Sequence, residues 1–455
     1  MTHVAIIGGG PGGYEAALVA RRSGADVTLI DRDGLGGSTV LTDCVPSKTL
    51  IATSDLLTEV GTSAELGVEI PSTVRADLAS VNARVLRLAQ AQSRDIDRLR
   101  SAGVEIIKGT GRIDAPGTVV ATTEEGERVV AADSILLATG AHPRVSPDAQ
   151  PDGERILTWE QVYGLEEIPE HLIVVGSGVT GAEFASAYNG LGARVTLVSS
   201  RDRVLPGEDP DAANLIENVF TRRGMTVMGN SRMASVAREG ERVIVTLTDG
   251  RTVEGSHCLL ALGSIPNTGD LGLDSVGVET DDGGFIAVDK VSRTSVPGIY
   301  AAGDCTGVLM LASVAAQQGR IAMAHLLGDA VNPLSRLKVS SNIFTSPEIA
   351  TVGLSQRQIE ERGLVVDATI LPLASNPRAK MQGVHDGFVK LFARQGIGTL
   401  VGGVVVGPRA SELIHPVSVA VSAQLTADHV ADAFTVDPSM SGSIAEAARR
   451  LHRLI

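Results

Sequence analysis

The chain has 455 residues, of which 51 are glycine, with 43% hydrophobic, 20% charged and 3% aromatic residues. These values are typical of a globular protein of about two to four domains, and they exclude a collagen repeat and wholesale disorder. The formal net charge of −14 argues against nucleic acid as a partner, because a surface of that sign repels phosphate backbones.

The sequence carries no recognisable membrane or secretion signal. No uncharged stretch reaches the roughly 18 apolar residues that a spanning helix needs, and neither a basic region nor a cleavage site precedes Val4. We therefore expect a cytoplasmic protein without a membrane span. Cys44, Cys258 and Cys305 are odd in number and widely spaced, which argues against a disulfide scaffold or a zinc ribbon, and we expect no metal site.

The N-terminal segment predicts a strand, a glycine turn, a helix and a second strand. The glycine turn consists of Gly8, Gly10, Pro11 and Gly13. The spacing Gly-x-Gly-x-x-Gly lets backbone N–H groups reach a pyrophosphate at a helix N-terminus, and an acidic residue about 20 positions later accepts from the ribose. Asp31 stands at that position, at the end of the second strand. The pattern predicts a dinucleotide site, and a plain glycine-rich turn is the alternative.

A small β-meander is predicted next. Residues 118–130 alternate between apolar and polar side chains around a turn, which is typical of a short antiparallel sheet. An apolar strand follows and ends at Thr139 and Gly140, and a proline-rich stretch up to Pro151 marks a linker.

The same plan recurs from residue 172 onward. A strand, a glycine turn, a helix and a second strand precede a second meander at 236–253 and an apolar strand that ends at Gly263. We assign Gly263 to the nucleotide site of this repeat. The second glycine turn and the start of its helix consist of Gly176, Gly178, Val179, Thr180 and Gly181. The repeat predicts two Rossmann-like α/β domains, each with a β-meander and one nucleotide site.

The ribose position of the second turn lacks an acidic residue. Ser199 follows the second strand, and Arg201, Asp202 and Arg203 come directly after it. A carboxylate here would repel a 2′-phosphate, whereas two guanidinium groups would bind it through charge-assisted hydrogen bonds. We therefore predict NADP(H), preferred over or used alongside NAD(H). In the alternative, both arginines lie on a solvated turn that Asp202 neutralises, and Ser199 tolerates either coenzyme.

The chain after Pro333 predicts a third unit without a further glycine fingerprint. Strands are predicted at 343–345, 388–393 and 399–406, with helices between and after them. This mixture is typical of an α+β domain, and by itself it indicates no chemistry.

Motifs along the whole chain resemble one enzyme family. Beyond the two glycine turns they are Gly36-Gly37, Cys44-Val45-Pro46-Ser47-Lys48, Ala138-Thr139-Gly140, Gly303-Asp304 and Phe344-Thr345-Ser346-Pro347-Glu348. In this order they resemble the flavoprotein disulfide reductases, which include dihydrolipoamide dehydrogenase, glutathione reductase and mercuric reductase. The resemblance implies an FAD-binding domain at 1–150 and 275–335, an NAD(P)-binding domain at 151–274, and a C-terminal dimerisation domain at 336–455 that forms a homodimer.

The resemblance also assigns residues to the FAD site, among them Gly37, Thr139 and Gly140. Gly111 is expected to approach the adenosine with its backbone, and Asp304 to bond the ribityl chain. Ala312 is expected beside the flavin ring, at a helix N-terminus that would favour the negative charge of a reduced flavin.

Lys48 and Glu183 are implied as a catalytic pair beside the flavin and the nicotinamide. The lysine would hold its charge close to the reactive nitrogen, and the glutamate would orient the lysine. The alternative is an ordinary ion pair between two domains, which contributes little.

Two departures from the family concern its sulfur chemistry. The family's redox disulfide is a Cys-x4-Cys pair; Cys44 matches its second cysteine, but Thr39 stands five residues earlier. A threonine hydroxyl cannot take or give up an electron pair, so we predict no dithiol. The family's His-Pro-Thr base segment reads Asp437-Pro438-Ser439 here, and an aspartate is a poor base at neutral pH.

Two further residues have two interpretations each. Cys44 either tunes the flavin as a thiolate or fills space as a neutral thiol, and we favour the inert role. His415 is either an acid–base group or part of the subunit interface, and we favour the interface.

The features that survive predict an FAD-dependent NAD(P)H oxidoreductase. It is similar to the dihydrolipoamide-dehydrogenase-like quinone reductases of actinobacteria and would not act as a dihydrolipoamide dehydrogenase. Hydride transfer to a flavin asks the protein mainly for position and field, so electrons would pass from the flavin to a quinone or similar small acceptor. The alternatives are a soluble pyridine nucleotide transhydrogenase and a non-catalytic flavoprotein subunit.

Overall fold

The chain forms two compact units in a computed structural model that describes residues 2–70 and 73–451. The first unit comprises the described residues up to Thr49 together with Asn82–Arg144 and Gly263–Ser335. The second unit comprises the described residues of Leu50–Val81, Val145–Leu262 and the chain from Arg336 onward. Within these described ranges, no helix is long and apolar enough to cross a membrane.

The first unit contains a five-stranded parallel sheet in the order β18-β7-β1-β2-β3. Its strands are β1 (His3–Ile7), β2 (Asp26–Asp31), β3 (Glu105–Lys108), β7 (Ser134–Leu137) and β18 (Ile299–Ala301). The central strands β1 and β7 are apolar and buried along almost their whole length. Continuous apolar runs of this kind are typical of a parallel sheet that is covered on both faces.

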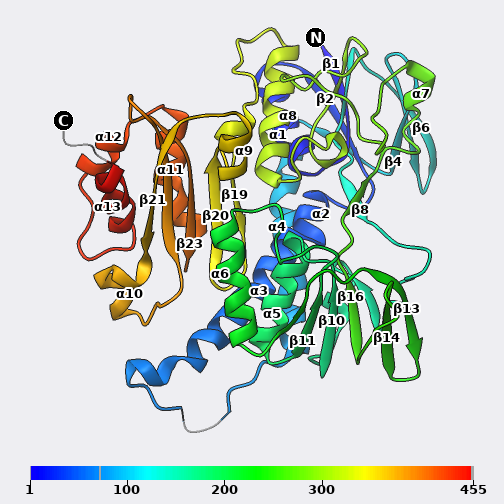
Figure 1. The fold of residues 1–455 in the computed structure, drawn as a ribbon. Helices are drawn as coiled ribbons and strands as arrows, with labels where there is room; N and C mark the ends of the chain where they lie inside the picture. The colour runs from blue at the N-terminus through cyan, green and yellow to red at the C-terminus, as the bar shows by residue number, and fades with distance from the viewer. Residues whose placement is uncertain (1, 71–72, 452–455) are drawn as a thin grey trace. The chain divides into compact units, whose positions relative to one another are not determined.

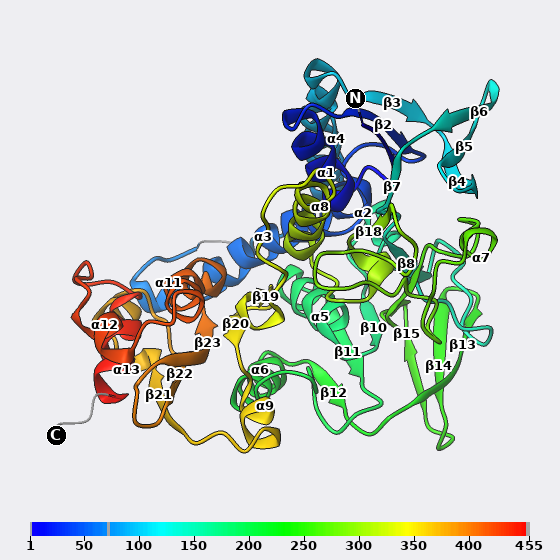
Figure 2. The same cartoon turned by 90° about the horizontal axis from the view of Figure 1, so that it is seen from above.

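Helices α1 (Pro11–Arg22) and α8 (Ala312–Leu326) lie side by side in this unit (Figures 1 and 2). A Cβ on Gly319 would lie 2.1 Å from the carbonyl oxygen of Gly12. Glycine at position 319 therefore allows the two helices to approach closely. Helices α2 (Gly37–Leu41) and α7 (Leu273–Val276) also belong to the first unit, whereas α3 (Cys44–Gly61) and α4 (Leu78–Ile96) have residues in both units.

Two smaller antiparallel sheets complete the first unit. The first predicted meander is formed by β4 (Thr110–Ala115), β5 (Thr118–Thr123) and β6 (Gly126–Ala131), and β8 (Ala141–Pro143) pairs with β17 (Ser264–Pro266). The meander and the parallel sheet share one hydrophobic core, in which Val119 and Ile135 are both buried.

The second unit repeats this plan, which confirms the predicted duplication. A parallel sheet in the order β12-β11-β10-β16-β9 is accompanied by the antiparallel sheet β13-β14-β15. The strands are β9 (Ile156–Thr158), β10 (His171–Val175), β11 (Arg194–Val198), β12 (Thr226–Met228), β13 (Met233–Glu239), β14 (Arg242–Leu247), β15 (Thr252–Gly255) and β16 (His257–Leu260). Helices α5 (Val179–Leu191) and α6 (Pro210–Arg222) lie beside the parallel sheet (Figure 1).

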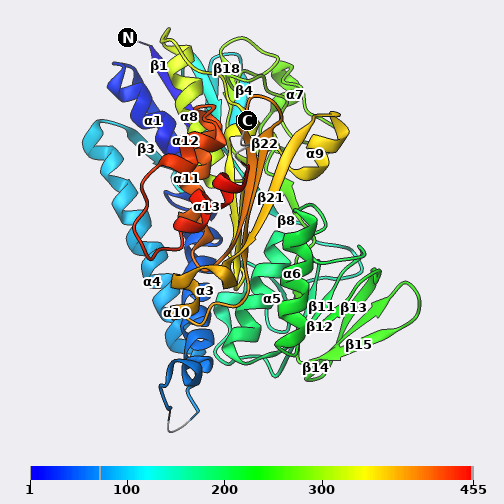
Figure 3. The same cartoon turned by 60° about the vertical axis from the view of Figure 1, so that its left-hand side comes forward.

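The C-terminal part of the second unit is a five-stranded antiparallel sheet in the order β19-β20-β23-β22-β21. Its strands are β19 (Ser340–Ile343), β20 (Glu348–Gly353), β21 (Val366–Pro372), β22 (Phe388–Arg394) and β23 (Leu400–Gly407). Its helices are α9 (Gln356–Glu361), α10 (Pro377–Met381), α11 (Ala410–Ser422), α12 (Ala427–Asp432) and α13 (Gly442–Leu451). Figure 3 shows α11, α12 and α13 on one face of this sheet.

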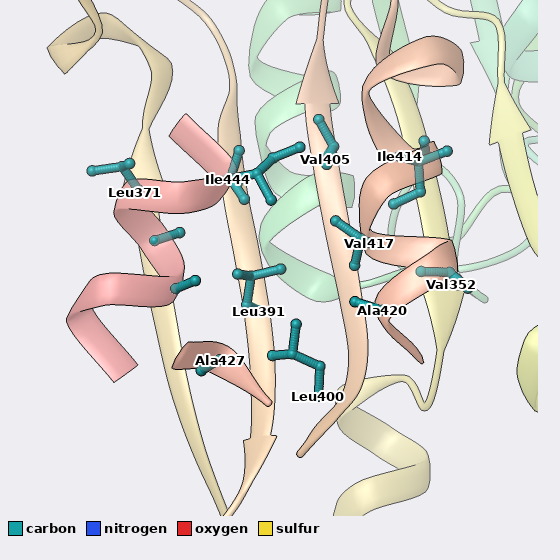
Figure 4. Packing of buried hydrophobic residues seen from close by; sticks show 14 of the residues in the cluster. Val352, Leu371, Leu391, Leu400, Val405, Ile414, Val417, Ala420, Ala427 and Ile444 are labelled. Atoms are coloured by element: carbon teal, nitrogen blue, oxygen red, sulfur yellow. The ribbon is translucent and has the colours of Figure 1, made fainter. Parts of the chain in front are cut away.

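The core of this part lies between the sheet and those helices. Leu391 and Val405 of the sheet pack in one cluster with Val417 of α11 and Ile444 of α13 (Figure 4). The predicted α/β fold with a C-terminal α+β part is confirmed.

One strand boundary differs from the sequence prediction. β19 ends at Ile343, before the end of the predicted strand. The N–H groups of Phe344 and Ser346 donate to the side chains of Glu183 and Ser186, at 2.9 and 3.1 Å, and so they are not available to a neighbouring strand. Strands β20 and β21, of six and seven residues, are absent from the prediction.

Candidate functional site

The first glycine turn joins β1 to α1 and has one open side. A Cβ on Gly8 would lie 2.2 Å from the carbonyl oxygen of Ala138, and one on Gly13 would lie 1.9 Å from that of Gly8, so both positions require glycine. A Cβ on Gly10 would meet nothing within 4 Å. The backbone at Gly10 is therefore open to a ligand at the N-terminus of the 12-residue helix α1, which begins with Pro11.

Gly37 and Asp31 border the same turn. A Cβ on Gly37 would lie 3.0 Å from the Cα of Gly10. Asp31 accepts the N–H groups of Gly9 at 2.7 Å and of Gly34 at 2.6 Å. Burial raises the pKa of Asp31 above its usual value, although these backbone hydrogen bonds act in the opposite direction. The structure thus fixes a carboxyl group at the end of β2, where the sequence predicts ribose recognition.

The other predicted FAD residues near the strand ends are held by contacts within the first unit. The Thr139 hydroxyl donates to the carbonyl of Asn267 at 2.8 Å, and the Asn267 side-chain amide donates to the carbonyl of Thr139 at 2.8 Å. The Asn267 N–H donates to the carbonyl of Gly140 at 3.0 Å. Gly111 lies against the end of β1, since a Cβ there would be 3.0 Å from the Ile7 side chain.

Asp304 lies in a short turn that follows β18. Burial, followed by the nearby charge of Asp43, raises the pKa of Asp304 from 3.8 to about 6. The turn is held by Gln318 of α8, whose side-chain oxygen accepts the N–H of Gly303 at 2.9 Å. Ala312 is the first residue of the 15-residue helix α8. A largely buried carboxyl group of this kind suits hydrogen bonds to ligand hydroxyls, as the resemblance implies for a ribityl chain.

The second glycine turn has the same local geometry. A Cβ on Gly176 would lie 2.1 Å from the carbonyl oxygen of Ala261, and one on Gly181 would lie 1.8 Å from that of Gly176. A Cβ on Gly178 would meet nothing within 4 Å. The first helical residues after the turn are Val179 and Thr180. Each turn thus has open backbone at the start of a helix, which fits the pyrophosphate of a dinucleotide.

Ser199 is buried beneath the turn that carries the two arginines. It is 0% exposed, its hydroxyl lies 2.7 Å from that of Ser177, and it accepts the N–H of Arg201 at 3.1 Å. Arg203 forms an ion pair with Asp202 at 3.1 Å, in agreement with the alternative that Asp202 neutralises this turn. Arg201 is exposed. A direct contact of Ser199 or the arginines with a nucleotide stays a prediction.

The remaining predicted residues are divided between the two units. Gly263 has a φ of +90°, and its carbonyl accepts the N–H of Arg144 at 2.9 Å. Lys48 lies in the N-terminal part of α3 in the first unit. Glu183 of the second unit is 4% exposed, and its carboxylate accepts the N–H of Phe344 at 2.9 Å. The Lys48–Glu183 pair and the approach of Gly263 to a nucleotide stay predictions.

None of the three cysteines forms a disulfide within the described chain. Cys258 and Cys305 are buried, and burial raises the pKa of both thiols, that of Cys305 to about 11. Both are therefore neutral and unreactive near pH 7. Cys44 begins α3, and Thr39 lies in α2.

A serine-rich helix start stands where the family has its histidine motif. The Ser439 hydroxyl accepts the N–H of Gly442, the first residue of α13, at 3.1 Å, and the Ser439 carbonyl accepts the Asn376 side-chain amide at 3.0 Å. Asp437 is exposed in this segment, and His415 is exposed on α11.

Four residues organise these features without belonging to any predicted site. They are Ser177, Asn267, Gln318 and Phe344. Asn267 and Phe344 act through hydrogen bonds to segments more than 100 positions away, and Gln318 through a bond to Gly303, 15 positions away. Such contacts leave no periodic pattern in the sequence, although Phe344 stands in one of the family motifs. Ser177 occupies a variable position of the glycine fingerprint, and only a position-by-position comparison of the two turns would have revealed it.

Known proteins match the chain over almost its whole length. The family described as "Pyridine nucleotide-disulphide oxidoreductase" matches residues 2–319, and its dimerisation domain matches residues 339–448. An NAD(P)H dehydrogenase (quinone) of Mycobacterium tuberculosis is 53% identical over 463 aligned residues, which cover 99% of this chain and 94% of that protein. A dihydrolipoyl dehydrogenase of Chlorobaculum parvum is 34% identical over 451 residues, which cover 98% and 96%.

Solved structures agree with this fold. The crystal structure of LpdA from Mycobacterium tuberculosis has a TM-score of 0.95 and 52% sequence identity, and the match covers 100% of both chains. The HOCl-induced flavoprotein disulfide reductase RclA from Escherichia coli has a TM-score of 0.88 at 24% identity, over 99% of this chain and 100% of RclA. At that identity the second likeness concerns the fold alone.

Proposed function

The chain belongs to the pyridine nucleotide-disulphide oxidoreductase family, and on that premise we propose that this oxidoreductase uses FAD and a nicotinamide nucleotide to reduce a quinone or a similar small acceptor. The acceptor class follows the relative that is 53% identical and is named NAD(P)H dehydrogenase (quinone). The proposal includes a homodimer formed through the C-terminal domain, which the match to the family's dimerisation domain supports. It also includes a cytoplasmic location.

The observation that carries the proposal is Thr39. In the family pattern a cysteine at this position would pair with Cys44 as the redox disulfide, and threonine has no sulfur to contribute. The buried thiols of Cys258 and Cys305, with their raised pKa values, are poor substitutes. Electrons would therefore leave this subunit without a sulfur relay.

The two glycine turns would hold the two dinucleotides. Gly10 and Gly178, which have open space on the side of a Cβ, would receive the pyrophosphates at the positive ends of α1 and α5. Asp31 would accept from the adenosine ribose of FAD, and Asp304 would bond the ribityl chain. When bound, FAD supplies the ability to accept hydride from a reduced nicotinamide and to deliver electrons to the acceptor.

Lys48 would have an electrostatic role beside the flavin. Its ammonium group would favour negative charge near the reactive nitrogen, and Glu183 would orient it. Oε1 of Glu183 is itself held by the backbone N–H of Phe344, which restricts the orientation of the carboxylate. Preorganised charges of this kind typically accelerate a reaction by about 10²–10³-fold.

We also propose that NADPH is preferred over NADH or used alongside it. The end of β11 carries a hydroxyl rather than a carboxylate, because Ser199 stands there. The exposed Arg201 would supply positive charge for a 2′-phosphate, while Arg203 is partly neutralised by Asp202.

The test is steady-state oxidation of NADPH and of NADH by the purified holoenzyme, with menadione, a redox dye or lipoamide as the acceptor. We expect turnover with menadione and the dye, none with lipoamide, and an anaerobic titration that ends at about two electrons per subunit. Robust lipoamide turnover, or storage of a further electron pair, would refute the proposal. Transfer only to a second nicotinamide nucleotide would favour a transhydrogenase.

A further inference from the structure

Two residues of helix α5 hold the segment that follows strand β19. Glu183 and Ser186 are three positions apart on α5, so their side chains lie on the same face of the helix. Oε1 of Glu183 accepts the N–H of Phe344 at 2.9 Å, and Oγ of Ser186 accepts the N–H of Ser346 at 3.1 Å. Glu183 and Ser186 are buried, at 4% and 7% exposure. The helix and the segment are therefore joined at two points.

Two further hydrogen bonds hold the same segment. The hydroxyl of Thr345, a residue that is 1% exposed, donates to the carbonyl of Pro347 at 2.7 Å. Arg223, at the C-terminus of α6, donates from Nη1 to the carbonyl of Ser346 at 2.9 Å. The backbone of Ser346 is thus held on both sides, its N–H by α5 and its carbonyl by the end of α6. The N–H of Phe344, two residues earlier, is fixed in position as a result.

The fixed N–H of Phe344 bears on the direction of the Glu183 carboxylate. A buried carboxylate has little contact with water, so its orientation depends on the groups that donate to it. A backbone N–H gives a defined direction only while its own segment stays in place. Loss of the Ser186 hydroxyl would remove the acceptor of the Ser346 N–H and let the segment move. The hydrogen bond from Phe344 to Glu183 would then be distorted.

We propose that Ser186 is a positioning residue for hydride transfer to the flavin: it holds the segment of residues 344–347, and this segment fixes the carboxylate of Glu183. The inference rests on the proposed function, in which Glu183 orients Lys48 beside the flavin. Ser186 acts only through Glu183. Thr345 contributes in the same way, because its hydroxyl holds the shape of the same segment.

A small displacement of Glu183 is enough to slow the reaction. Charged groups accelerate a reaction when they are preorganised, and a misplacement of about 1 Å can cost about 100-fold in rate. The effect of Ser186 is indirect, because the N–H of Phe344 stays attached to the chain nearby when the serine hydroxyl is lost. We therefore expect a loss of about tenfold in the rate of flavin reduction.

The experiment measures flavin reduction in the holoenzyme by anaerobic stopped flow. The reductant is whichever of NADPH and NADH reduces the wild type faster, and its concentration is varied to give a limiting rate and an apparent Kd. No electron acceptor is present, so the result does not depend on the quinone. The wild type is compared with Ser186→Ala, Thr345→Val, Glu183→Gln, Ser186→Ala/Glu183→Gln and the matched control Ser341→Ala.

Two of these variants separate charge from position and local packing from the proposed contact. In Glu183→Gln the amide oxygen can still accept the N–H of Phe344, but the negative charge is lost. In Ser341→Ala a serine hydroxyl of β19 is lost that bonds to the hydroxyl of Thr351, at 2.8 Å, within the C-terminal sheet.

We expect Ser186→Ala and Thr345→Val each to lower the limiting rate about tenfold, with an apparent Kd within about twofold of the wild type. Ser341→Ala should keep the wild-type limiting rate. Glu183→Gln should by itself lower the limiting rate at least about tenfold. In that background Ser186→Ala should cost less than about twofold more, because a residue that acts through a charge has no effect once the charge is gone.

Three results would overturn the inference by itself. They are a wild-type limiting rate in Ser186→Ala, the same factor lost on Ser186→Ala with and without Glu183→Gln, and an equal loss in Ser341→Ala. Thr345→Val tests the same segment if Ser186→Ala does not fold. A wild-type limiting rate in Glu183→Gln would refute the role of Glu183 in the proposed function and, with it, this inference. A wild-type flavin that is reduced without turnover of any quinone would refute only the proposed acceptor.

Discussion

Replacing Lys390 by methionine tests a buried ion pair within the second unit. Lys390 lies on β22, and its side chain is 3% exposed. Its ammonium donates to Asp209 at 2.8 Å, to Asp211 at 2.7 Å and to Gln356 at 2.7 Å. Asp209 also caps the N-terminus of α6. The lysine therefore links the C-terminal sheet to α6, the helix that follows β11.

The expected loss of stability falls mainly on Asp209. Asp211 and Gln356 border a cavity of about 530 Å³, so water can replace the lysine beside them. The Asp209 side chain is 2% exposed, although it keeps the N–H groups of Asp211 and Ala212 as donors. Removing one partner of a buried pair costs about 3–5 kcal/mol. Because these two hydrogen bonds remain, we expect about 3 kcal/mol, which lowers Tm by about 6–12 °C.

Thermal unfolding of the holoenzyme, followed by circular dichroism, measures this effect. Lys380→Met is the matched control, because Lys380 is exposed in the same unit, and it should change Tm by only about 1–2 °C. In Lys390→Met/Asp209→Asn a neutral amide still caps α6, so at least half of the loss should be recovered. A Lys390→Met variant as stable as the control, or a double variant no better than Lys390→Met, would show that the buried charge is not the cause.

Three further predictions concern the proposed FAD site. The raised pKa of Asp304, about 6, means that ionising its carboxyl group destabilises the folded protein. Without cofactor, Asp304→Asn should therefore be more stable than wild type above pH 6, by at most about 3 kcal/mol, and of similar stability near pH 4. Urea unfolding at pH 4 and pH 8 measures the difference, and equal stability at pH 8 would contradict it. In Gly9→Ala the new Cβ would lie 3.0 Å from Asp31 Oδ2, and we expect the FAD dissociation constant to rise about tenfold in fluorescence titrations. The control Gly164→Ala adds a Cβ at a position with open space and should leave this constant unchanged. Lys48→Met should slow flavin reduction by NADPH about 100-fold in stopped-flow traces with FAD retained; an unchanged rate excludes the electrostatic role.

The duplicated architecture was predictable because each copy contains long elements with a clear period. The parallel strands around β1 and β10 are continuous apolar runs, and each glycine turn is followed by a helix. The C-terminal sheet was predicted less completely. Its strand β19 ends at Ile343, because the N–H groups of Phe344 and Ser346 are taken by side chains of α5, and no local pattern reports such a contact.

The candidate site was predictable where the backbone leaves no room for a side chain. Gly8, Gly13 and their counterparts in the second turn would clash with a carbonyl oxygen if they carried a Cβ, so the fingerprint follows from the geometry. The polar contacts that hold the site were not predictable. Thr139 and Asn267 are 128 positions apart in the chain, and a side-chain hydrogen bond over such a separation has no periodic signature. The bond between Gln318 and Gly303 spans only 15 positions, but it joins a helix to a turn and is equally without a periodic signature.

Thr39 and Ser199 would concern opposite ends of the proposed electron path. Ser199 would concern the nucleotide that donates hydride, whereas Thr39 would concern the route by which electrons leave. Ser199 belongs to the second unit and Thr39 to the first, and Ser199 is buried within its own turn. Because the proposal makes separate statements about the coenzyme and about the acceptor, the acceptor test uses both coenzymes, so that each preference is measured by itself.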